Sequence, residues 1–422
     1  MSLKGLLILL VIIILAVAIA AGATFLYFVW QETMPKLTPT TKSDEQTVAG
    51  EPLFPTGETQ KPEPPAGQPG TTTEEELVVK KPTLVPLVKL ATKPVAGFFM
   101  LGSGTSTQVV FADRASGHLY VIRPSEGINP VRVSNTTIPK IYELYGGQSG
   151  QEIKIIARYL KGGLPQNFST GLPQDQPAGA EPAVLEGKFL SSQIYSLVVA
   201  PAQDKIFYLD RTGNETQGII ADFDGGKKTI VFDSPFNEWL TSWPDASTIA
   251  LQSKTTSDIP GSLYFLDIKN KTPTKIISNV PGLTTLVSPD RKKVAYSAQW
   301  QKELVFGVYD IKERLFGRLP FRTLADKCTW SKSGSLYCAA PADLPLAAYP
   351  EDWYSGEVSS NDRFWKVGSE NYRAQLLFDP QLAGFNEAID ATSLSVDADE
   401  SFLLFLNKKD LNLWLLNLKE GF

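Results

Sequence analysis

The sequence has few of the residues that catalytic and metal sites most often require. Its 422 residues include one histidine, His118, and two cysteines, Cys328 and Cys338. A Ser-His-Asp triad would need His118 itself, and no G-x-S-x-G nucleophile elbow occurs. So few cysteines and histidines exclude a Cys/His zinc site and a disulfide-dense scaffold. We therefore expect no metal, no other cofactor and no catalytic residue of these types.

The chain also has no excess of positive charge. Its 40 Lys and Arg residues are outnumbered by 45 Asp and Glu residues, which gives a net charge of −5 and a pI near 5.3. Binding to nucleic acid requires a basic surface that neutralises phosphates. The composition therefore argues against nucleic acid as a partner.

The clearest single feature is an apolar run near the N-terminus. Residues 6–30, "LLILLVIIILAVAIAAGATFLYFVW", contain no charged side chain, and about 20 such residues suffice to cross a bilayer. A cleaved signal peptide is the alternative, but "TFLYFVW" continues the apolar run beyond the small residues at 18–23. We expect an uncleaved transmembrane helix, with residues 1–5 in the cytoplasm and the rest of the chain outside.

The composition changes sharply after this run. Residues 31–83 are rich in Pro, Thr and Glu, as in "TGETQKPEPPAGQPGTTTEEE". Such a stretch cannot bury enough apolar surface to fold. The sequence therefore predicts a disordered stalk over residues 31–83, followed by a folded domain over 84–422.

The folded domain repeats one short pattern, in which a strand is followed by a tight turn and a second strand. Its copies are "VAPAQDKIFY" (199–208), "SWPDASTIAL" (242–251), "VSPDRKKVAY" (287–296), "WSKSGSLYC" (330–338) and "VDADESFLLF" (396–405). Equivalent positions recur at steps of 43, 45, 43 and 66 residues. Pro, Asp, Ser and Gly are the residues that such turns favour. Periods of 40–50 residues are typical of propellers.

Each copy is followed by further short strands, which indicates four antiparallel strands per unit. We expect an all-β, seven-bladed β-propeller with units starting near 95, 139, 193, 236, 281, 323 and 387. Two weaker copies upstream leave the count between six and eight. The last unit lacks a fourth strand, and residues 84–92, "LVPLVKLAT", are expected to supply it and close the ring.

The turn "SPDRKK" between two strands resembles the repeat of the TolB-type β-propeller family, which is related to the WD repeat. The resemblance covers about residues 84–422 and implies the propeller fold, but no particular function. The chain lacks the α/β domain that precedes the TolB propeller and has an expected anchor and stalk instead. The lipoprotein partner of TolB is therefore not carried over.

Two sets of residues are candidates for function. Propeller glycosidases place acids around the central channel, and four acids precede expected innermost strands: Glu143, Glu238, Asp326 and Asp390. The second set consists of large aromatic and arginine side chains in connections on one face, which are typical of binding interfaces. Its members are Trp300, Tyr349, Trp353, Tyr354, Arg114 and Arg211.

Three of these aromatic residues lie in an insertion of about 22 residues, 340–362, in the sixth unit. This loop either binds a partner or folds back over the channel. In the same unit, Cys328 and Cys338 oppose each other across one hairpin, and they form either a disulfide or two buried thiols.

Together these observations favour a membrane-anchored, extracytoplasmic propeller that binds a protein or an envelope polymer without catalysis. The alternative is a carbohydrate-active envelope enzyme that uses the channel carboxylates.

Overall fold

The computed structural model describes residues 86–174, 180–370 and 372–419. The expected cytoplasmic end, transmembrane helix and stalk lie outside these ranges. Within them, no helix is both long and apolar enough to cross a bilayer.

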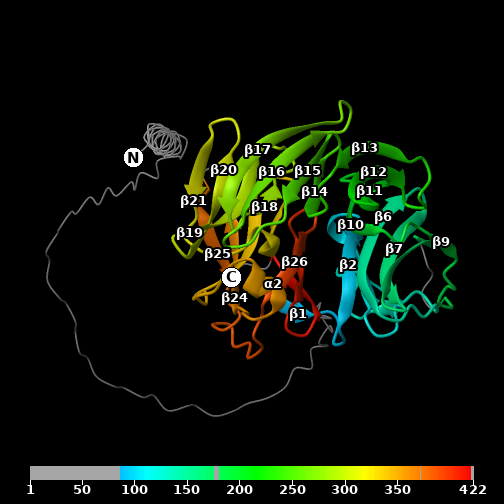
Figure 1. The fold of residues 1–422 in the computed structure, drawn as a ribbon. Helices are drawn as coiled ribbons and strands as arrows, with labels where there is room; N and C mark the ends of the chain where they lie inside the picture. Colours follow the sequence, from blue (N-terminus) through cyan, green and yellow to red (C-terminus); the bar gives the residue numbers. More distant parts are fainter. Residues whose placement is uncertain (1–85, 175–179, 371, 420–422) are drawn as a thin grey trace, which may run out of the picture. The chain divides into compact units, whose positions relative to one another are not determined.

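The described chain forms seven four-stranded antiparallel sheets, the blades of a β-propeller, which follow one another around a ring in chain order (Figure 1). Blade 1 contains β2 (Val95–Leu101), β3 (Gln108–Asp113), β4 (Leu119–Ile122) and β5 (Val131–Arg132). Blade 2 contains β6 (Ile141–Ser149), β7 (Glu152–Lys161), β8 (Leu164–Pro173) and β9 (Gly187–Phe189). Blade 3 contains β10 (Ile194–Val199), β11 (Lys205–Thr212), β12 (Glu215–Asp222) and β13 (Thr229–Ser234).

Blade 4 contains β14 (Trp239–Asp245), β15 (Thr248–Ser253), β16 (Pro260–Asp267) and β17 (Thr272–Pro281). Blade 5 contains β18 (Thr284–Val287), β19 (Lys293–Trp300), β20 (Glu303–Asp310) and β21 (Leu315–Arg318). Blade 6 contains β22 (Cys328–Trp330), β23 (Leu336–Pro341), β24 (Asp362–Val367) and β25 (Ala374–Phe378). Blade 7 contains β26 (Ala391–Val396), β27 (Phe402–Asn407) and β28 (Leu413–Asn417). The predicted seven-bladed architecture is confirmed.

Blade 7 takes its fourth strand from the beginning of the described chain. Strand β1 (Leu87–Lys89) pairs antiparallel with β28, with Leu87 opposite Leu416. The segment expected to supply this strand, 84–92, contains β1. Because the outermost strand of blade 7 precedes blade 1 in the sequence, the two ends of the ring are joined by backbone hydrogen bonds.

The core is divided among the seven spaces between neighbouring blades. Each space holds one cluster of buried apolar side chains. Successive side chains of strand β23 alternate between two of these clusters. Leu336 and Cys338 face blade 5, whereas Tyr337 and Ala339 face blade 7. A blade is therefore apolar on both faces, and its stability depends on its two neighbours.

The repeated turn positions the first two strands of each blade. In blade 5, the Ser288 hydroxyl donates to Asp290 at 2.7 Å and accepts from the Lys293 N–H at 3.0 Å. Pro289 occupies the first central position, and Arg291 takes up the left-handed region with φ 58°. The turn chemistry seen in the sequence thus sets the register between β18 and β19.

Candidate functional site

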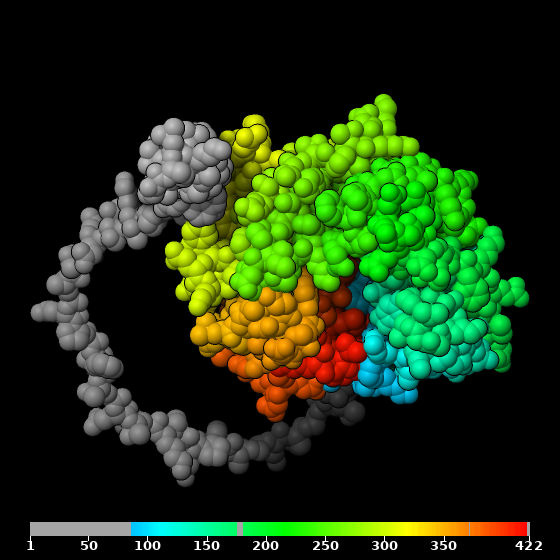
Figure 2. All heavy atoms as spheres, in the orientation of Figure 1, coloured from blue at the N-terminus to red at the C-terminus, as the bar shows by residue number. Residues whose placement is uncertain are grey.

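The connections between strands divide the ring into two faces. Because each blade is antiparallel and begins with its innermost strand, turns between first and second strands lie on one face, which we call the turn face. Connections between second and third strands, and those leading to the next blade, lie on the other. We call it the insertion face, because it carries residues 342–361 between β23 and β24. Figure 2 shows a recess between the blue-to-green and the orange-to-red parts of the ring.

The insertion forms a small structured cap. It contains the helix α2 (Glu351–Ser355) and has its own apolar cluster, in which Tyr349 and Trp353 pack against Leu304 and Leu324. Tyr349 is 3% exposed and Trp353 is 5% exposed. These two predicted contact residues are therefore not accessible to a partner, and the loop follows the alternative in which it folds back on the ring.

A buried ion network lies under Trp353. The Lys327 ammonium forms ion pairs with Asp390 and, at 2.8 Å, with Asp362. The Trp353 indole N–H and the Ser360 hydroxyl donate to Asp390, each at 3.0 Å. One cation and two carboxylates in the protein interior require many such hydrogen bonds to offset their desolvation. The network ties the insertion to the innermost part of blades 6 and 7.

The pKa values of the two carboxylates in this network are shifted in opposite directions. Burial alone would raise the pKa of Asp390, but the Lys327 ammonium and the Trp353 and Ser360 hydrogen bonds outweigh it and lower the pKa. The pKa of Asp362 is raised by burial, which the attraction of Lys327 does not overcome, and by the neighbouring Asp390 carboxylate. Asp390 thus serves as the ionised partner of Lys327.

Further contacts hold the insertion across several blades. Glu351 accepts hydrogen bonds from the Ser257 backbone N–H, at 2.9 Å, and from the Ser257 hydroxyl in blade 4. The Tyr354 hydroxyl donates to Asp326 at 3.0 Å, and the Lys408 ammonium donates to the Trp353 carbonyl. The insertion therefore extends over the insertion face from blade 4 to blade 7.

The other predicted contact residues are accessible. Trp300 and Tyr354 are each 43% exposed, and Arg114 and Arg211 are exposed as well. The Arg211 guanidinium lies over the Tyr195 ring, 4.9 Å from its centroid.

The sequence interpretation missed four exposed apolar side chains of this face. They lie in its connections and are Phe236, Ile259, Leu346 and Leu382. Leu346 is 91% exposed and Leu382 is 83% exposed. The available signal was an apolar residue inside a connection rich in Pro, Ser, Asp or Gly, a signal that is weak because such residues usually pack inward.

A cavity of about 690 Å³ lies in the central channel. Its wall comes from the innermost strands of blades 2 to 7 and includes two of the four predicted carboxylates, Glu143 and Asp326. Glu143 pairs with the buried Arg158 guanidinium at 2.5 Å and accepts from the Tyr145 hydroxyl at 3.1 Å. Arg158 also donates to Asn167 and to the Ile194 carbonyl. Glu143 is thus held in a fixed orientation at the channel wall.

Asp326 faces the channel from the short helix η2 (Ala325–Lys327). Its side chain is exposed to channel water, yet protein surrounds it closely, and this desolvation raises its pKa despite the hydrogen bond from Tyr354. Among the described residues, no cation pairs with Asp326. It is therefore the one acid of the described channel wall without a cationic partner.

The remaining two predicted carboxylates do not line this cavity. Glu238 lies in the open, 61% exposed, and pairs with Lys254 at 3.0 Å and with Arg211 at 4.0 Å. Asp390 is buried against Lys327. The four acids therefore do not meet in one pocket, and three of them are ion-paired.

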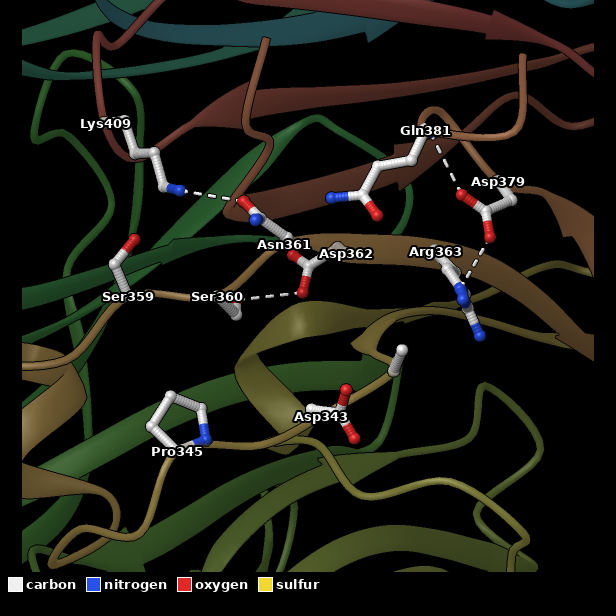
Figure 3. Close-up of a pocket in the computed structure, with 11 residues that line it drawn as sticks. Asp343, Pro345, Ser359, Ser360, Asn361, Asp362, Arg363, Asp379, Gln381 and Lys409 are labelled. Atoms are coloured by element: carbon white, nitrogen blue, oxygen red, sulfur yellow. Dashed lines mark hydrogen bonds and ion pairs between the residues drawn. The ribbon is translucent and has the colours of Figure 1, made fainter. Parts of the chain in front are cut away.

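A second hollow of about 290 Å³ lies beside the insertion, on the same face. Figure 3 shows the residues that line it. Arg363 pairs with Asp379 at 2.6 Å, and Lys409 donates to Asn361 at 3.0 Å. Most of its charges are thus engaged with one another. In blade 6, Cys328 and Cys338 are joined in a disulfide between directly opposed positions of β22 and β23. Among the described residues, no cluster of His, Cys, Asp or Glu is arranged to hold a metal.

No family model and no curated protein matches the chain. Solved structures do resemble it. An oligogalacturonate lyase from Vibrio parahaemolyticus matches with a TM-score of 0.51 at 11% identity, over 79% of this chain and 94% of the lyase. Hydrazine synthase from Kuenenia stuttgartiensis matches with a TM-score of 0.50 at 11% identity, over 80% of this chain and 99% of that one.

TolB from Acinetobacter baumannii is 12% identical, with a TM-score of 0.42, over 80% of this chain and 81% of TolB. Identities this low are informative about the fold alone. The chain is a seven-bladed β-propeller, similar in structure and at low identity to oligogalacturonate lyase.

Proposed function

We propose that this protein is a membrane-anchored, extracytoplasmic binding protein, whose insertion face holds a protein or an envelope polymer without catalysis. The observation that carries the proposal is the distribution of exposed apolar side chains. Phe236, Ile259, Leu346 and Leu382 lie in connections of the insertion face, and Trp300 ends β19 on that face. At the turn face, Leu315 and Val131 are exposed where the outermost strands of blades 5 and 1 begin. Exposed apolar and aromatic side chains in the connections of neighbouring blades, here blades 3 to 7, are characteristic of interaction surfaces.

The point at which the chain enters the ring also supports the insertion face as the partner site. Pro86, the first described residue, accepts a hydrogen bond from the Asn417 N–H at the turn-face end of β1. The segment that holds the expected anchor and stalk therefore joins the ring on the turn face. The chain enters the ring on the face opposite the proposed partner site.

The test compares the two faces in intact cells. A photoreactive amino acid replaces Leu346 on the insertion face or Lys312 on the turn face, whose side chains are 91% and 90% exposed. We expect one discrete crosslinked species from position 346 and none from position 312. Equal crosslinking from the two positions, or none from either, would contradict the proposal.

The anchor and its compartment need a separate test. We expect the full chain to stay in the membrane fraction after a carbonate wash and a chain without residues 6–30 to leave it. We also expect Cys328 and Cys338 to resist alkylation in cells until a reductant is added, because disulfides persist outside the cytoplasm. Free thiols in the cell would contradict the extracytoplasmic location.

One observation favours a second candidate, the carbohydrate-active enzyme. Glu143 and Asp326 line one cavity, where Glu143 is ion-paired with Arg158 and burial raises the pKa of Asp326. Glycoside hydrolysis uses two acids, one protonated and one ionised. If this candidate is right, Glu143→Gln abolishes turnover of a glycan panel by the purified chain, whereas Glu238→Gln leaves it unchanged. Absence of turnover by the unmodified chain would eliminate it.

A further inference from the structure

The channel cavity has a charge balance that selects among ligands. Arg158 is the one cation of its wall, and its hydrogen bonds go to Glu143, Asn167 and the Ile194 carbonyl. Lys327, next to Asp326 in the sequence, turns away into the buried network with Asp362 and Asp390. Among the described residues of the wall, Asp326 is therefore the acid that has no cationic partner.

The hydroxyl and amide groups of the wall are largely engaged with one another. Ser196 pairs with Thr241 at 2.8 Å, and Thr285 donates to the Gln252 side chain at 2.7 Å. The Gln252 amide in turn donates to the Leu283 carbonyl at 3.0 Å. The wall thus offers a ligand oxygen acceptors and a carboxylate, and few uncommitted donors. Since Arg158 is engaged, a phosphate or carboxylate ligand would find no uncommitted cation among the described residues of the wall.

The cavity also has an apolar part. Leu240 is 41% exposed and lines the cavity together with Leu197, Leu286 and Leu394. At about 690 Å³ the space falls within the roughly 300–1,000 Å³ of small-molecule sites. In addition, Ser393 lines the cavity in the left-handed region with φ 55°, at an irregularity of β26. Such backbone positions cluster at ligand sites.

We infer that the channel binds a small organic cation, an ammonium or guanidinium group on an apolar body, with Asp326 as its counter-ion. The cation donates to the carboxylate oxygens, while the body lies against the leucine side chains of the inner strands. The Tyr354 hydroxyl already orients the carboxylate from the insertion. This inference concerns the channel and does not depend on the proposed partner of the insertion face.

The experiment uses three probes that share one body and differ in charge: 2-phenylethylammonium, 2-phenylethanol and phenylacetate. Each is titrated calorimetrically into the full chain in detergent. We expect the ammonium to bind in the millimolar range or tighter and at least about tenfold more strongly than the alcohol, with no binding of phenylacetate. Equal binding of the three probes, or no binding of the ammonium up to about 10 mM, would overturn the inference without any variant.

Two matched variants locate the site. Asp326→Asn preserves the shape of the side chain and is expected to weaken ammonium binding about tenfold, with the alcohol unaffected. Asp343→Asn removes an exposed acid of the insertion that does not line the channel, and it should change nothing. Unaltered ammonium binding by Asp326→Asn, or an equal loss in Asp343→Asn, would place the cation elsewhere and refute the assignment. Failure of the crosslinking test above would leave this result intact.

Discussion

The two faces of the ring are built from the same strands but joined by different connections. Turns between first and second strands are short and polar, as in "SPDRK" (288–292) and "SKSGS" (331–335), and they link neighbouring blades through partly exposed ion pairs such as Arg291 with Asp245. The insertion face carries the longest connection, residues 342–361, together with the exposed side chains of Phe236, Ile259 and Leu382 and the buried network of Lys327. The turn face thus links neighbouring blades, and the insertion face carries the structured insertion.

The largest difference between the faces should appear when one lysine is removed from each. Lys327→Met leaves Asp362 and Asp390 buried without their cation, which we expect to lower the free energy of unfolding by about 3–5 kcal/mol. Lys312→Met, at a 90% exposed position of the turn face, should change it by less than about 0.5 kcal/mol. Urea denaturation followed by tryptophan fluorescence measures both. If Lys327→Met lowers the free energy of unfolding no more than Lys312→Met does, the two buried carboxylates do not depend on the Lys327 cation.

This network also marks the limit of the sequence interpretation. The repeated turns predicted the blades and the closing strand because each signal spans about ten residues and reports local backbone geometry. Asp390 was identified as a channel acid, whereas it lies buried against Lys327, which is 63 residues away in the sequence. Neighbours Asp326 and Lys327 point in opposite directions, one to the channel and one to the interior. No local pattern states which neighbour is buried.

The aromatic residues of the insertion were hard to assign for a related reason. Tyr349, Trp353 and Tyr354 are equally large and lie in one proline-rich loop, but two are buried and one is exposed. Their burial depends on whether Leu304, Leu324 and the Lys327 network lie beneath them. The composition of the loop was therefore compatible both with a contact surface and with a cap.

A second measurement concerns the hairpin of β22 and β23 in blade 6, which contains the disulfide. The disulfide joins buried side chains, 5% exposed at Cys328 and 0% at Cys338, and it closes the turn-face loop "TWSKSGSLY". Replacing both cysteines with alanine is expected to cost about 2–3 kcal/mol of unfolding free energy. Addition of dithiothreitol to the unmodified chain should cause a loss of similar size, and it should have no effect on the double variant. A reductant effect on the double variant would contradict this interpretation.

The strongest link on the turn face gives a pH-dependent test. Glu400 of blade 7 accepts from the Tyr337 hydroxyl at 2.6 Å and pairs with Lys366 of blade 6 at 2.8 Å. Burial opposes ionisation, but the Lys366, Ser333 and Tyr337 hydrogen bonds prevail and lower the pKa of Glu400 from 4.5 to about 2. Since the pKa is lower in the folded state, the stabilisation is complete above pH 4.5 and disappears as the pH falls toward 2.

Glu400→Gln should therefore lower the unfolding free energy by about 2 kcal/mol at pH 7, and the difference from the unmodified chain should vanish near pH 2. Denaturation curves at pH 7, 5 and 3 measure this trend. Glu313→Gln, a change at a 59% exposed acid of the same face, serves as the control and should give no pH-dependent difference. A constant difference for Glu400→Gln across this range would exclude the carboxylate as its source.

The smallest effect on unfolding free energy is expected for a more exposed ion pair of the turn face. Asp245 and Arg291 link blades 4 and 5, with side chains 23% and 44% exposed, and Arg291 also donates to Thr248 at 3.0 Å. Because water screens this pair, Asp245→Asn should cost less than about 1 kcal/mol, and about 1 M salt should abolish most of that difference. A double-mutant cycle with Arg291→Met isolates the pairwise energy from the other contacts of each residue. A coupling as large as the loss at Lys327 would mean that the turn face, too, depends on desolvated charge, and the contrast between the two faces would then rest on the structured insertion alone.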